Sequence, residues 1–272
     1  MIVFPNAKIN FGLRITAKRP DGFHDIESIF FPVNLHDALE FVIPEGKPES
    51  DILNVSGFDT GSSSEDNLVI KTATKLHSGY DLPKFRIHLH KAIPAGAGLG
   101  GGSSDAAWFL KAVNRQFLLG IADSELKDTA LSLGSDCPFF LENIPAIATG
   151  RGEQLKPAGN FLQRYYLVLL NPGLHISTKE AYSNCIPSKP SESLEDLVKL
   201  PVNEWKNHIM NDFESFAFGK YALIGDLKSG LYKAGALFSL MSGSGSSVFG
   251  IFTEKKRLPD NLRKYLIYEG FL

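Results

Sequence analysis

A cluster of glycines is the first feature of the sequence whose residue types and spacing could do chemistry. Residues 94–104 read Pro-Ala-Gly-Ala-Gly-Leu-Gly-Gly-Gly-Ser-Ser, so five glycines fall within seven positions. Glycine lets a backbone approach a phosphate closely and adopt positive φ angles, and successive N–H groups then point at the phosphate oxygens. A strand is predicted before the run and a helix after it, whose N-terminus would strengthen the attraction. The sequence therefore predicts a phosphate-binding loop, in which Ser103 and Ser104 donate hydroxyls or help to hold Mg²⁺.

A linker or a different nucleotide-binding motif would account for this run less well. A flexible linker would not lie between a strand and a helix with a strong apolar pattern. A Walker A loop would need a Lys-Ser or Lys-Thr pair after the last glycine, and none follows. Gly96, Gly98 and Gly101 match the spacing of a dinucleotide-binding fingerprint, but no acidic residue ends a strand at the expected distance. A second cluster, residues 241–247, fits a hairpin turn and a functional loop equally well.

Ionisable side chains in apolar surroundings are the next candidates. Asp136 follows the helix end predicted at Gly134 and precedes Pro138, so it is either a helix cap or a functional group. Lys8 lies in an apolar strand, so its ammonium is either buried with a partner or extended to the surface. Asn10, two residues on, shares the same face of that strand. A carboxylate, an ammonium and an amide of this kind suit proton transfer and anion binding.

An aromatic ring and an imidazole follow the turn at residues 19–22. Phe23 and His24 occupy positions where packing rarely calls for such side chains, so they are either ligand contacts or a loop aromatic packed on the domain. His88 and His90 share one strand face, and two ligands without a third favour a solvated face over a metal site. No metal site is predicted.

The elements that must position these residues show as local patterns. Strands are predicted at residues 9–15, 39–43, 52–55, 85–90, 165–170, 236–240 and 247–252. Helices are predicted from a cap at Asp66 or Asn67 to about residue 77, from Ser103 or Ser104 to about Gly120, from Ser124 to Gly134, and from about Tyr221 to Gly235. A further helical stretch is predicted within 204–217, and residues 187–195 are predicted to form an exposed loop. Interspersed helices and strands indicate an α/β or α+β class.

Charge and composition exclude several classes of protein. Lys plus Arg is 28 and Asp plus Glu is 30, so the formal net charge is −2 and a surface that coats nucleic acid is not expected. No apolar stretch approaches about 18 residues, so no membrane-spanning helix is expected, and the N-terminus does not resemble a signal peptide. Two cysteines fit a reducing compartment. The expectation is a cytoplasmic protein.

Three segments together resemble the GHMP kinase superfamily, whose members include galactokinase, homoserine kinase and mevalonate kinase. Residues 94–104 resemble its ATP loop, residues 5–10 (Pro-Asn-Ala-Lys-Ile-Asn) its first motif and residues 241–245 (Met-Ser-Gly-Ser-Gly) its third, in the family's order. Residues 19–24, 133–140, 150–153 and 171–173 resemble the 4-diphosphocytidyl-2-C-methyl-D-erythritol kinase branch. Phe23 stands where this branch often has Tyr, and Cys137 where it often has Val.

The resemblance implies an α+β, two-domain GHMP kinase fold. Residues 1–157 would form a ribosomal-protein-like ATP-binding domain and residues 158–272 a ferredoxin-like substrate domain. The implied reaction is ATP-dependent phosphorylation of the 2-hydroxyl of 4-diphosphocytidyl-2-C-methyl-D-erythritol, in the non-mevalonate isoprenoid pathway, with Mg²⁺. Two alternatives remain open at this point: another kinase of the superfamily acting on homoserine or mevalonate, and a non-catalytic RNA-binding module.

Roles carry over position by position. The catalytic residues would be Asp136, which accepts or orients the hydroxyl proton, and Lys8, which pairs with Asp136 and places positive charge beside the phosphoryl group. Asn10 would help to position the hydroxyl, Phe23 and His24 would hold the cytidine, and Thr178 and Tyr182 would contribute to nucleotide recognition. The small-molecule substrate is the only partner expected, with no nucleic acid and no membrane, in a monomer or a homodimer. ATP would contact Pro94, Ala95, Gly96, Ala97, Gly98, Leu99, Gly100, Gly101, Gly102, Ser103 and Ser104.

Overall fold

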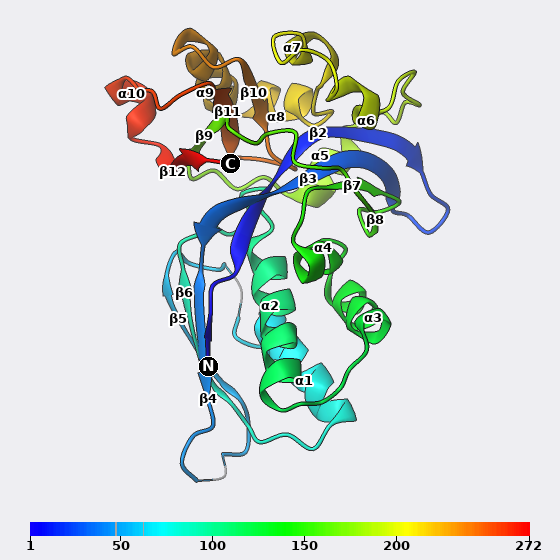
Figure 1. Cartoon of the computed structure of the whole chain (residues 1–272), viewed down its shortest axis with the longest axis vertical. Coiled ribbons are helices and arrows are strands. Elements are labelled where there is room, and N and C mark those ends of the chain that lie inside the picture. The colour runs from blue at the N-terminus through cyan, green and yellow to red at the C-terminus, as the bar shows by residue number, and fades with distance from the viewer. Residues whose placement is uncertain (47, 62) are drawn as a thin grey trace. The chain divides into compact units, whose positions relative to one another are not determined.

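A computed structural model describes residues 1–46, 48–61 and 63–272, and its backbone contacts divide the chain into two units (Figure 1). Unit 1 comprises Met1–Ala7, Leu35–Ala95 and Gly100–Asn143, and unit 2 comprises Lys8–Asn34, Gly96–Leu99 and Ile144–Leu272. Both units contain helices and sheets, so the predicted α+β class is confirmed. The division into domains at residues 157 and 158 stays a prediction.

Unit 1 is built on a four-stranded sheet. Its strands are β1 (Ile2–Val3), β4 (Ala38–Val42), β5 (Ile52–Gly57) and β6 (Arg86–Lys91), in the order β1-β4-β6-β5. Strand β4 runs antiparallel to β1 and to β6, whereas β5 runs parallel to β6. Ile87 and Leu89 are buried, whereas Arg86, His88 and His90 are exposed, as the alternating pattern predicts.

Helices cover the apolar face of this sheet. They are α1 (Leu68–Gly79) and α2 (Gly101–Gln116), which Figure 1 shows beside β4–β6, while α3 (Asp123–Leu133) and α4 (Cys137–Glu142) pack against α2. Phe41 and Phe85 from the sheet side meet Phe109 of α2 edge to face, with ring centroids 5.2 and 5.8 Å from it. These rings form the centre of the core that fixes α2 on the sheet.

The ends of α1, α2 and α3 agree only in part with those predicted from capping residues and glycines in the sequence. Asn67 caps α1 through a hydrogen bond from Val69 N, as predicted. The start predicted for α2 at Ser103 or Ser104 is wrong, because α2 begins at Gly101 with Gly100 as its cap residue. Ser124 is likewise inside α3, whose cap residue is Ala122, whereas the end of α3 at Gly134 is confirmed. The glycine run therefore supplies the first turn of α2 itself.

Unit 2 contains two four-stranded sheets. The first sheet has the strand order β2-β3-β7-β8 and consists of β2 (Asn6–Lys18), β3 (His24–His36), β7 (Ala146–Thr149) and β8 (Gln154–Pro157). The second sheet has the strand order β10-β11-β9-β12 and consists of β9 (Tyr166–Leu170), β10 (Phe238–Met241), β11 (Val248–Phe252) and β12 (Leu266–Phe271). The pairs within the second sheet are antiparallel. No strand at residues 24–36 or 266–271 was singled out from the sequence.

Six helices among the described residues complete unit 2. They are α5 (Thr178–Ser183), α6 (Leu194–Leu197), α7 (Trp205–His208), α8 (Glu214–Lys220), α9 (Ala222–Lys233) and α10 (Asp260–Arg263). The predicted helix from Tyr221 is confirmed as α9, which buries Ile224, Leu227 and Leu231 and packs against β10 and β11. The stretch within 204–217 forms two short helices, α7 and α8, separated by residues 209–213.

A helix that spans a bilayer must be both long and apolar. None of the helices in the described part of the chain meets both requirements.

Candidate active site

Three segments that lie far apart in the sequence meet inside unit 2. The backbone N–H of Asn10 donates to the hydroxyl of Ser242 at 3.0 Å, and that hydroxyl donates to the carbonyl oxygen of Gly98 at 2.8 Å. Lys8 N also donates to Leu99 O at 2.9 Å, and Ser247 N donates to Ala97 O at 3.2 Å. The first motif, the first half of the glycine loop and the third motif are therefore joined by hydrogen bonds.

The glycine loop needs its glycines for two separate reasons. Gly96, Gly98 and Gly100 have φ angles of 62°, 77° and 71°, which side chains with a Cβ rarely adopt. A Cβ on Gly98 would also lie 2.0 Å from the backbone oxygen of Ser242, a distance that no rearrangement of a side chain could relieve. Residue 98 therefore holds the third motif against the loop. The cluster at 241–247 is thus part of this junction and more than a hairpin turn.

Gly102 differs from its neighbours in the run. It lies exposed in the first turn of α2, and the nearest atom to a Cβ placed there would be Leu68 Cδ1 at 4.0 Å. No contact within the described protein accounts for a glycine here, whereas close approach of a ligand to the helix N-terminus would account for it.

Lys8 is buried in its strand and does not extend to the surface, which is one of the two arrangements that the sequence allows. Its side chain donates to Asn10 Oδ1, and its ammonium lies 4.3 Å from the centre of the Phe30 ring. Asn10 in turn donates from Nδ2 to Ser28 Oγ at 3.0 Å. Lys8 and Asn10, which were predicted to share one strand face, are in direct contact.

Asp136 lies in unit 1 as the residue before α4, half-buried. Asp136 is the N-cap residue of α4, as one of its two interpretations predicts, although its side chain makes no capping hydrogen bond to that helix. Because Lys8 belongs to unit 2 and Asp136 to unit 1, their pairing stays a prediction.

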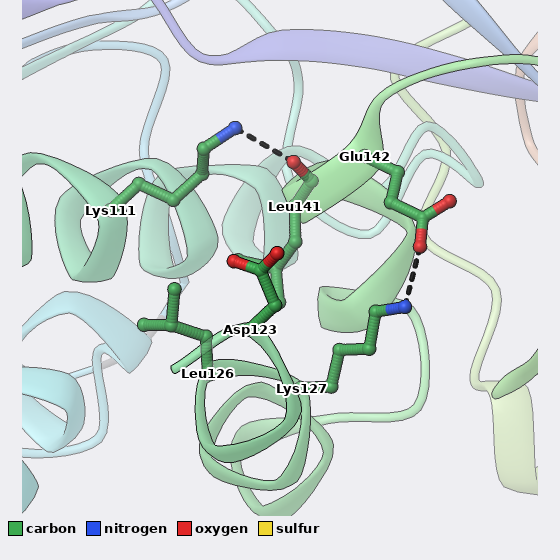
Figure 2. Close-up of a pocket in the computed structure, with 6 residues that line it drawn as sticks. All are labelled: Lys111, Asp123, Leu126, Lys127, Leu141 and Glu142. Atoms are coloured by element: carbon green, nitrogen blue, oxygen red, sulfur yellow. Dashed lines mark hydrogen bonds and ion pairs between the residues drawn. The ribbon is translucent and has the colours of Figure 1, made fainter. Parts of the chain in front are cut away.

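Two lysines hold the far end of α4 (Figure 2). Lys111 of α2 donates to the carbonyl of Leu141 at 2.7 Å, and Lys127 of α3 pairs with Glu142 at 2.6 Å. Burial lowers the pKa of Lys111, while the negative charge of Asp123 acts in the opposite direction. These contacts fix the short helix that carries Asp136 at its start.

The same side chains line a cavity of about 210 Å³ together with Asp123 and Leu126. None of the residues predicted to bind ATP or substrate lines this cavity, and both of its lysines already have partners.

His88 and His90 both contact the hydroxyl of Ser56, at 2.9 and 3.0 Å, on the exposed face of the unit 1 sheet. Among the residues described, no three His, Cys, Asp or Glu side chains are grouped to hold a metal ion.

The segment at residues 211–214 holds the third motif, a function that the sequence did not suggest. Asn211 Nδ2 donates to the carbonyls of Met241 and Gly243, both at 2.8 Å. Glu214 Oε1 accepts from Met241 N at 2.9 Å, and its other oxygen pairs with Lys228 at 2.6 Å. Asn211 and Glu214 were missed because their partners lie about 30 residues away and show no local pattern.

A stack of aromatic rings lies close to this segment in unit 2. His24 and Tyr182 are stacked with ring centroids 4.9 Å apart and planes 17° from parallel, and Phe213 meets Tyr182 edge to face at 4.9 Å. Phe23 is 52% exposed, with the Arg151 guanidinium 4.8 Å from its ring centre. An exposed ring beside a cation and an adjacent stack offers flat surfaces that a nucleobase could contact. The structure therefore brings His24 and Tyr182 together, while Phe23, the residue before His24, faces solvent.

Thr178, the remaining predicted substrate residue, is the first residue of α5, four positions before Tyr182. Its hydroxyl lies 3.2 Å from that of Ser244 in the third motif. Thr178 thus links α5 to the junction of the three motifs.

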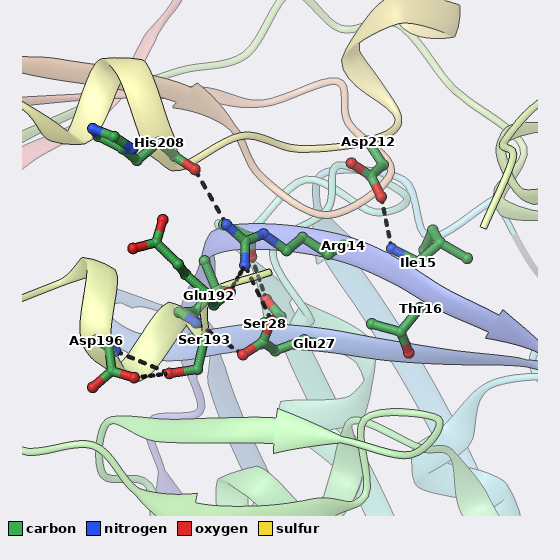
Figure 3. A network of polar contacts seen from close by, with 12 residues as sticks. Arg14, Ile15, Thr16, Glu27, Ser28, Glu192, Ser193, Asp196, His208 and Asp212 are labelled. Atoms are coloured by element: carbon green, nitrogen blue, oxygen red, sulfur yellow. Dashed lines mark hydrogen bonds and ion pairs between the residues drawn. The ribbon is translucent and has the colours of Figure 1, made fainter. Parts of the chain in front are cut away.

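A polar network ties the segment around residues 188–212 to β2 and β3 (Figure 3). Arg14 donates to the carbonyls of Glu192 at 2.6 Å and His208 at 3.2 Å, while Glu27 Oε1 accepts from Leu194 N at 2.8 Å. The carboxylate of Asp212 accepts from Ile15 N at 2.7 Å, and burial raises the pKa of that carboxyl. The prediction of an exposed loop at 187–195 is only partly confirmed: residues 187–193 are exposed or half-buried, but Leu194 is fully buried and begins α6.

Comparison with known proteins agrees with this arrangement. The model of the GHMP kinases N terminal domain matches residues 67–143, and the model of the GHMP kinases C terminal domain matches residues 194–267. The two matches include α2 with the glycine run before it, and the segments that hold the third motif.

Similar proteins extend the match to almost the whole chain. The chain is 49% identical over 252 residues to a 4-diphosphocytidyl-2-C-methyl-D-erythritol kinase of Parabacteroides distasonis, covering 93% of this chain and 92% of the relative. It is 46% identical over 258 residues to the protein of the same name from Bacteroides fragilis, covering 95% and 94%. A crystal structure of 4-(cytidine 5'-diphospho)-2C-methyl-D-erythritol kinase is 31% identical, with a TM-score of 0.79 over 98% of this chain and 96% of that one.

The fold is thus the two-domain α+β fold of the GHMP kinases, which are ATP-dependent enzymes. Within that superfamily the chain belongs to the 4-diphosphocytidyl-2-C-methyl-D-erythritol kinase family.

Proposed function

We propose that this chain transfers the γ-phosphoryl group of ATP to the 2-hydroxyl of 4-diphosphocytidyl-2-C-methyl-D-erythritol. The observation that carries the proposal is the hydrogen-bonded junction of Asn10, Gly98 and Ser242, which joins the three motif segments in unit 2. The high identity to kinases of that name supports the choice of substrate over homoserine or mevalonate. The enzyme would work in the cytoplasm, where ATP is supplied.

Asp136 and Lys8 are the proposed catalytic residues. Transfer of a phosphoryl group to an alcohol requires the hydroxyl to be held in line and its proton to be accepted. The Asp136 carboxylate, half-buried at the start of α4, would take the acceptor role. Lys8 would contribute positive charge where negative charge develops, and its bond to Asn10 holds its side chain in one orientation.

ATP would be held mainly by backbone groups of the glycine loop and the first turn of α2. With a net charge of −2, the protein does not depend on an excess of lysines and arginines to bind a polyanion. Magnesium usually keeps several waters and takes further oxygens from the substrate's phosphates, so it would arrive with ATP and would neutralise phosphate charge. Ser103, half-buried in the first turn of α2, is the residue that would offer it a hydroxyl.

The cytidine would bind beside the aromatic stack. His24 offers an imidazole for hydrogen bonds to the base, Tyr182 fixes its orientation by stacking, and the exposed ring of Phe23 offers a stacking face. Thr178, through Ser244, connects this region to the third motif.

The test is a comparison of three alcohols with ATP and Mg²⁺. Purified protein is assayed for ADP release with the cytidine-linked methylerythritol, with homoserine and with mevalonate, and kcat/KM is measured for each. We expect turnover with the first substrate. We expect kcat/KM to be at least ~10²-fold lower with homoserine and mevalonate, because neither carries a cytidine group that could bind beside the aromatic stack. A higher kcat/KM for homoserine or mevalonate would contradict the proposed substrate. Salt-sensitive RNA binding without any kinase activity would favour the non-catalytic alternative.

A further inference from the structure

Three charged side chains are buried together in unit 1, and none of them is among the residues proposed to contact ATP or substrate. Lys91 ends β6, Asp37 lies between β3 and β4, and Asp105 lies in the second turn of α2. Their side chains are 2%, 0% and 3% exposed. The Lys91 ammonium donates to Asp37 Oδ2 and, at 2.7 Å, to Asp105 Oδ2. We call these three residues the Lys91 cluster.

The Lys91 cluster holds both ends of the glycine loop. On the strand side, Asp37 Oδ1 accepts from Ala92 N at 2.6 Å and Ile93 N at 2.8 Å, immediately before the loop begins at residue 94. On the helix side, Asp105 belongs to α2, which starts as the loop ends. The same lysine therefore connects the residues before the loop to the helix after it.

The two ends of the loop also touch directly. A Cβ on Gly101, the first residue of α2, would lie 2.9 Å from Ile93 Cγ2 and 3.2 Å from Lys91 Nζ. A side chain at residue 101 would thus press on the side chains of Ile93 and Lys91, so contacts within the protein account for the glycine here. The glycine loop is closed at its base by this contact together with the Lys91 cluster.

Such closure matters because glycines are flexible. A run of five glycines samples many conformations, and ordering it only when ATP binds would cost conformational entropy and weaken binding. A buried ion pair is, on the other hand, weak evidence of stabilisation, because removing charges from water opposes the attraction between them. A role in preorganisation accounts for three buried charges at this place better than a role in stability does.

We propose that Asp37, Lys91 and Asp105 are positioning residues for the reaction, a buried clamp that holds the glycine loop in its ATP-binding conformation. The inference rests on the proposed function only in that the ligand of the loop is ATP. The Lys91 cluster is buried away from solvent, so it acts through the loop and not by touching the substrate alcohol. Its effect therefore falls on ATP affinity more than on turnover.

The charge state of the cluster is consistent with a neighbouring polyanion. Burial raises the pKa of the Asp105 carboxyl to about 7, although Lys91 acts in the opposite direction. Burial disfavours the charge on Lys91, but the carboxylates of Asp105 and Asp37 outweigh that effect and raise its pKa. The raised pKa of Asp105 therefore disfavours a second negative charge in the cluster, which limits its repulsion of phosphate.

Asp105→Ala is the variant that tests the clamp, with ATP affinity and thermal stability measured separately. The substitution removes the link from Lys91 to α2 but leaves Lys91 paired with Asp37, so a folded protein is expected. We expect the Kd for ATP, measured by titration calorimetry, to rise by about 10-fold or more, a change of the size that one well-placed interaction confers. We expect kcat at saturating ATP to fall far less. Asp105→Asn keeps an oxygen for Lys91 and should restore most of the affinity.

The matched control is Asp51→Ala in the same unit. Asp51 is also a buried carboxylate, with its side chain 7% exposed. It accepts a hydrogen bond from the N–H of Phe85, the residue before β6, at 2.7 Å, and it pairs with a basic side chain, His77, at 3.0 Å. It lies at the opposite end of β6 from the loop, so its loss should lower Tm without changing the Kd for ATP.

Equal Kd values for Asp105→Ala and the wild type, with Tm lowered as in the control, would overturn the clamp and leave a purely structural cluster. An unchanged Kd in Asp105→Ala accompanied by lower kcat would overturn it as well. Wild-type turnover in the same series keeps the two proposals apart, since a protein that binds ATP without phosphorylating the cytidine-linked alcohol contradicts only the proposed function.

Discussion

The backbone N–H of Asn10 donates a 3.0 Å hydrogen bond to the hydroxyl of Ser242, a residue 232 positions later in the chain. Ser242 is fully buried, and its hydroxyl donates a second hydrogen bond to the Gly98 carbonyl. One hydroxyl therefore sets the spacing between the strand that carries Lys8 and the start of the glycine loop.

Replacing that hydroxyl should lower activity as well as stability. Ser242→Ala leaves Asn10 N and Gly98 O without their shared partner, which costs about 1–3 kcal/mol for buried groups. We expect a loss of about 10-fold or more in kcat/KM, because a small displacement of catalytic groups has a large effect on rate. Ser239→Ala is the matched control: Ser239 is also fully buried and bonded to a carbonyl, that of Phe249 at 2.8 Å. An equal loss of kcat/KM in both variants would show a general effect of stability.

Two glycines of the loop should respond in opposite ways to alanine. Gly102→Ala places a methyl group in open space within a helix, so the free energy of unfolding should rise by up to ~1 kcal/mol. The KM for ATP should nevertheless increase, because the methyl group obstructs approach to the helix N-terminus. Gly98→Ala should instead unfold or markedly destabilise the protein, since its Cβ meets the Ser242 backbone. Thermal melts and ATP titrations of both variants check this, and an unchanged KM in Gly102→Ala would remove residue 102 from the ATP site.

Asp136→Asn separates catalysis from folding. We expect kcat to fall by at least ~10²-fold, the lower range of general-base contributions, with ATP affinity nearly intact. Because Asn has nearly the shape of Asp and keeps a side-chain oxygen at the start of α4, Tm should change little. Asp128→Asn, an exposed change on α3, serves as the control and should leave kcat unaltered. Unchanged turnover in Asp136→Asn would exclude Asp136 from the mechanism.

Tyr182→Ala should affect one substrate and not the other. Loss of the ring removes the stack on His24 and the contact with Phe213, so the KM for the cytidine substrate should rise by about 10-fold, the value of one aromatic pair. The KM for ATP should stay within about twofold, because the residue lies outside the glycine loop. Tyr182→Phe keeps the ring and should behave like the wild type. A parallel rise in both KM values would argue against a cytidine site here.

Cys137 should be chemically inert in the folded protein. Burial raises the pKa of its thiol to about 12 from a usual value of 9.0, so the reactive thiolate is scarce at neutral pH. Because the folded pKa is raised, the stabilising contribution is complete below about pH 9 and disappears as the pH rises towards 12. A Cys185→Ser variant isolates the thiol: we expect no reaction with a thiol reagent at about pH 8 until denaturant is added. Rapid labelling without denaturant would contradict the burial of Cys137.

Local signals in the sequence determined a large part of the secondary structure. Asn67 caps α1 and Tyr221 precedes α9 as predicted, because capping and apolar periodicity act within a few residues along the chain. The glycine run indicated a phosphate loop for the same reason, since the conformations it permits depend on residue type alone. One of the two interpretations of Lys8 from the sequence, burial in an apolar strand, is confirmed.

The tertiary structure decided what these local signals could not. Helix α2 begins at Gly101, two residues before the first serine predicted to cap it. Gly101 packs closely against Ile93 and Lys91, a contact between residues on either side of the loop that the local pattern does not reveal. The roles of Asn211 and Glu214 depend on carbonyl and amide groups about 30 residues away, and the link from Asp105 to Lys91 depends on the closure of a loop. The residue types at these positions are visible in the sequence, but their partners are chosen by the topology, which brings together segments that no short-range pattern connects.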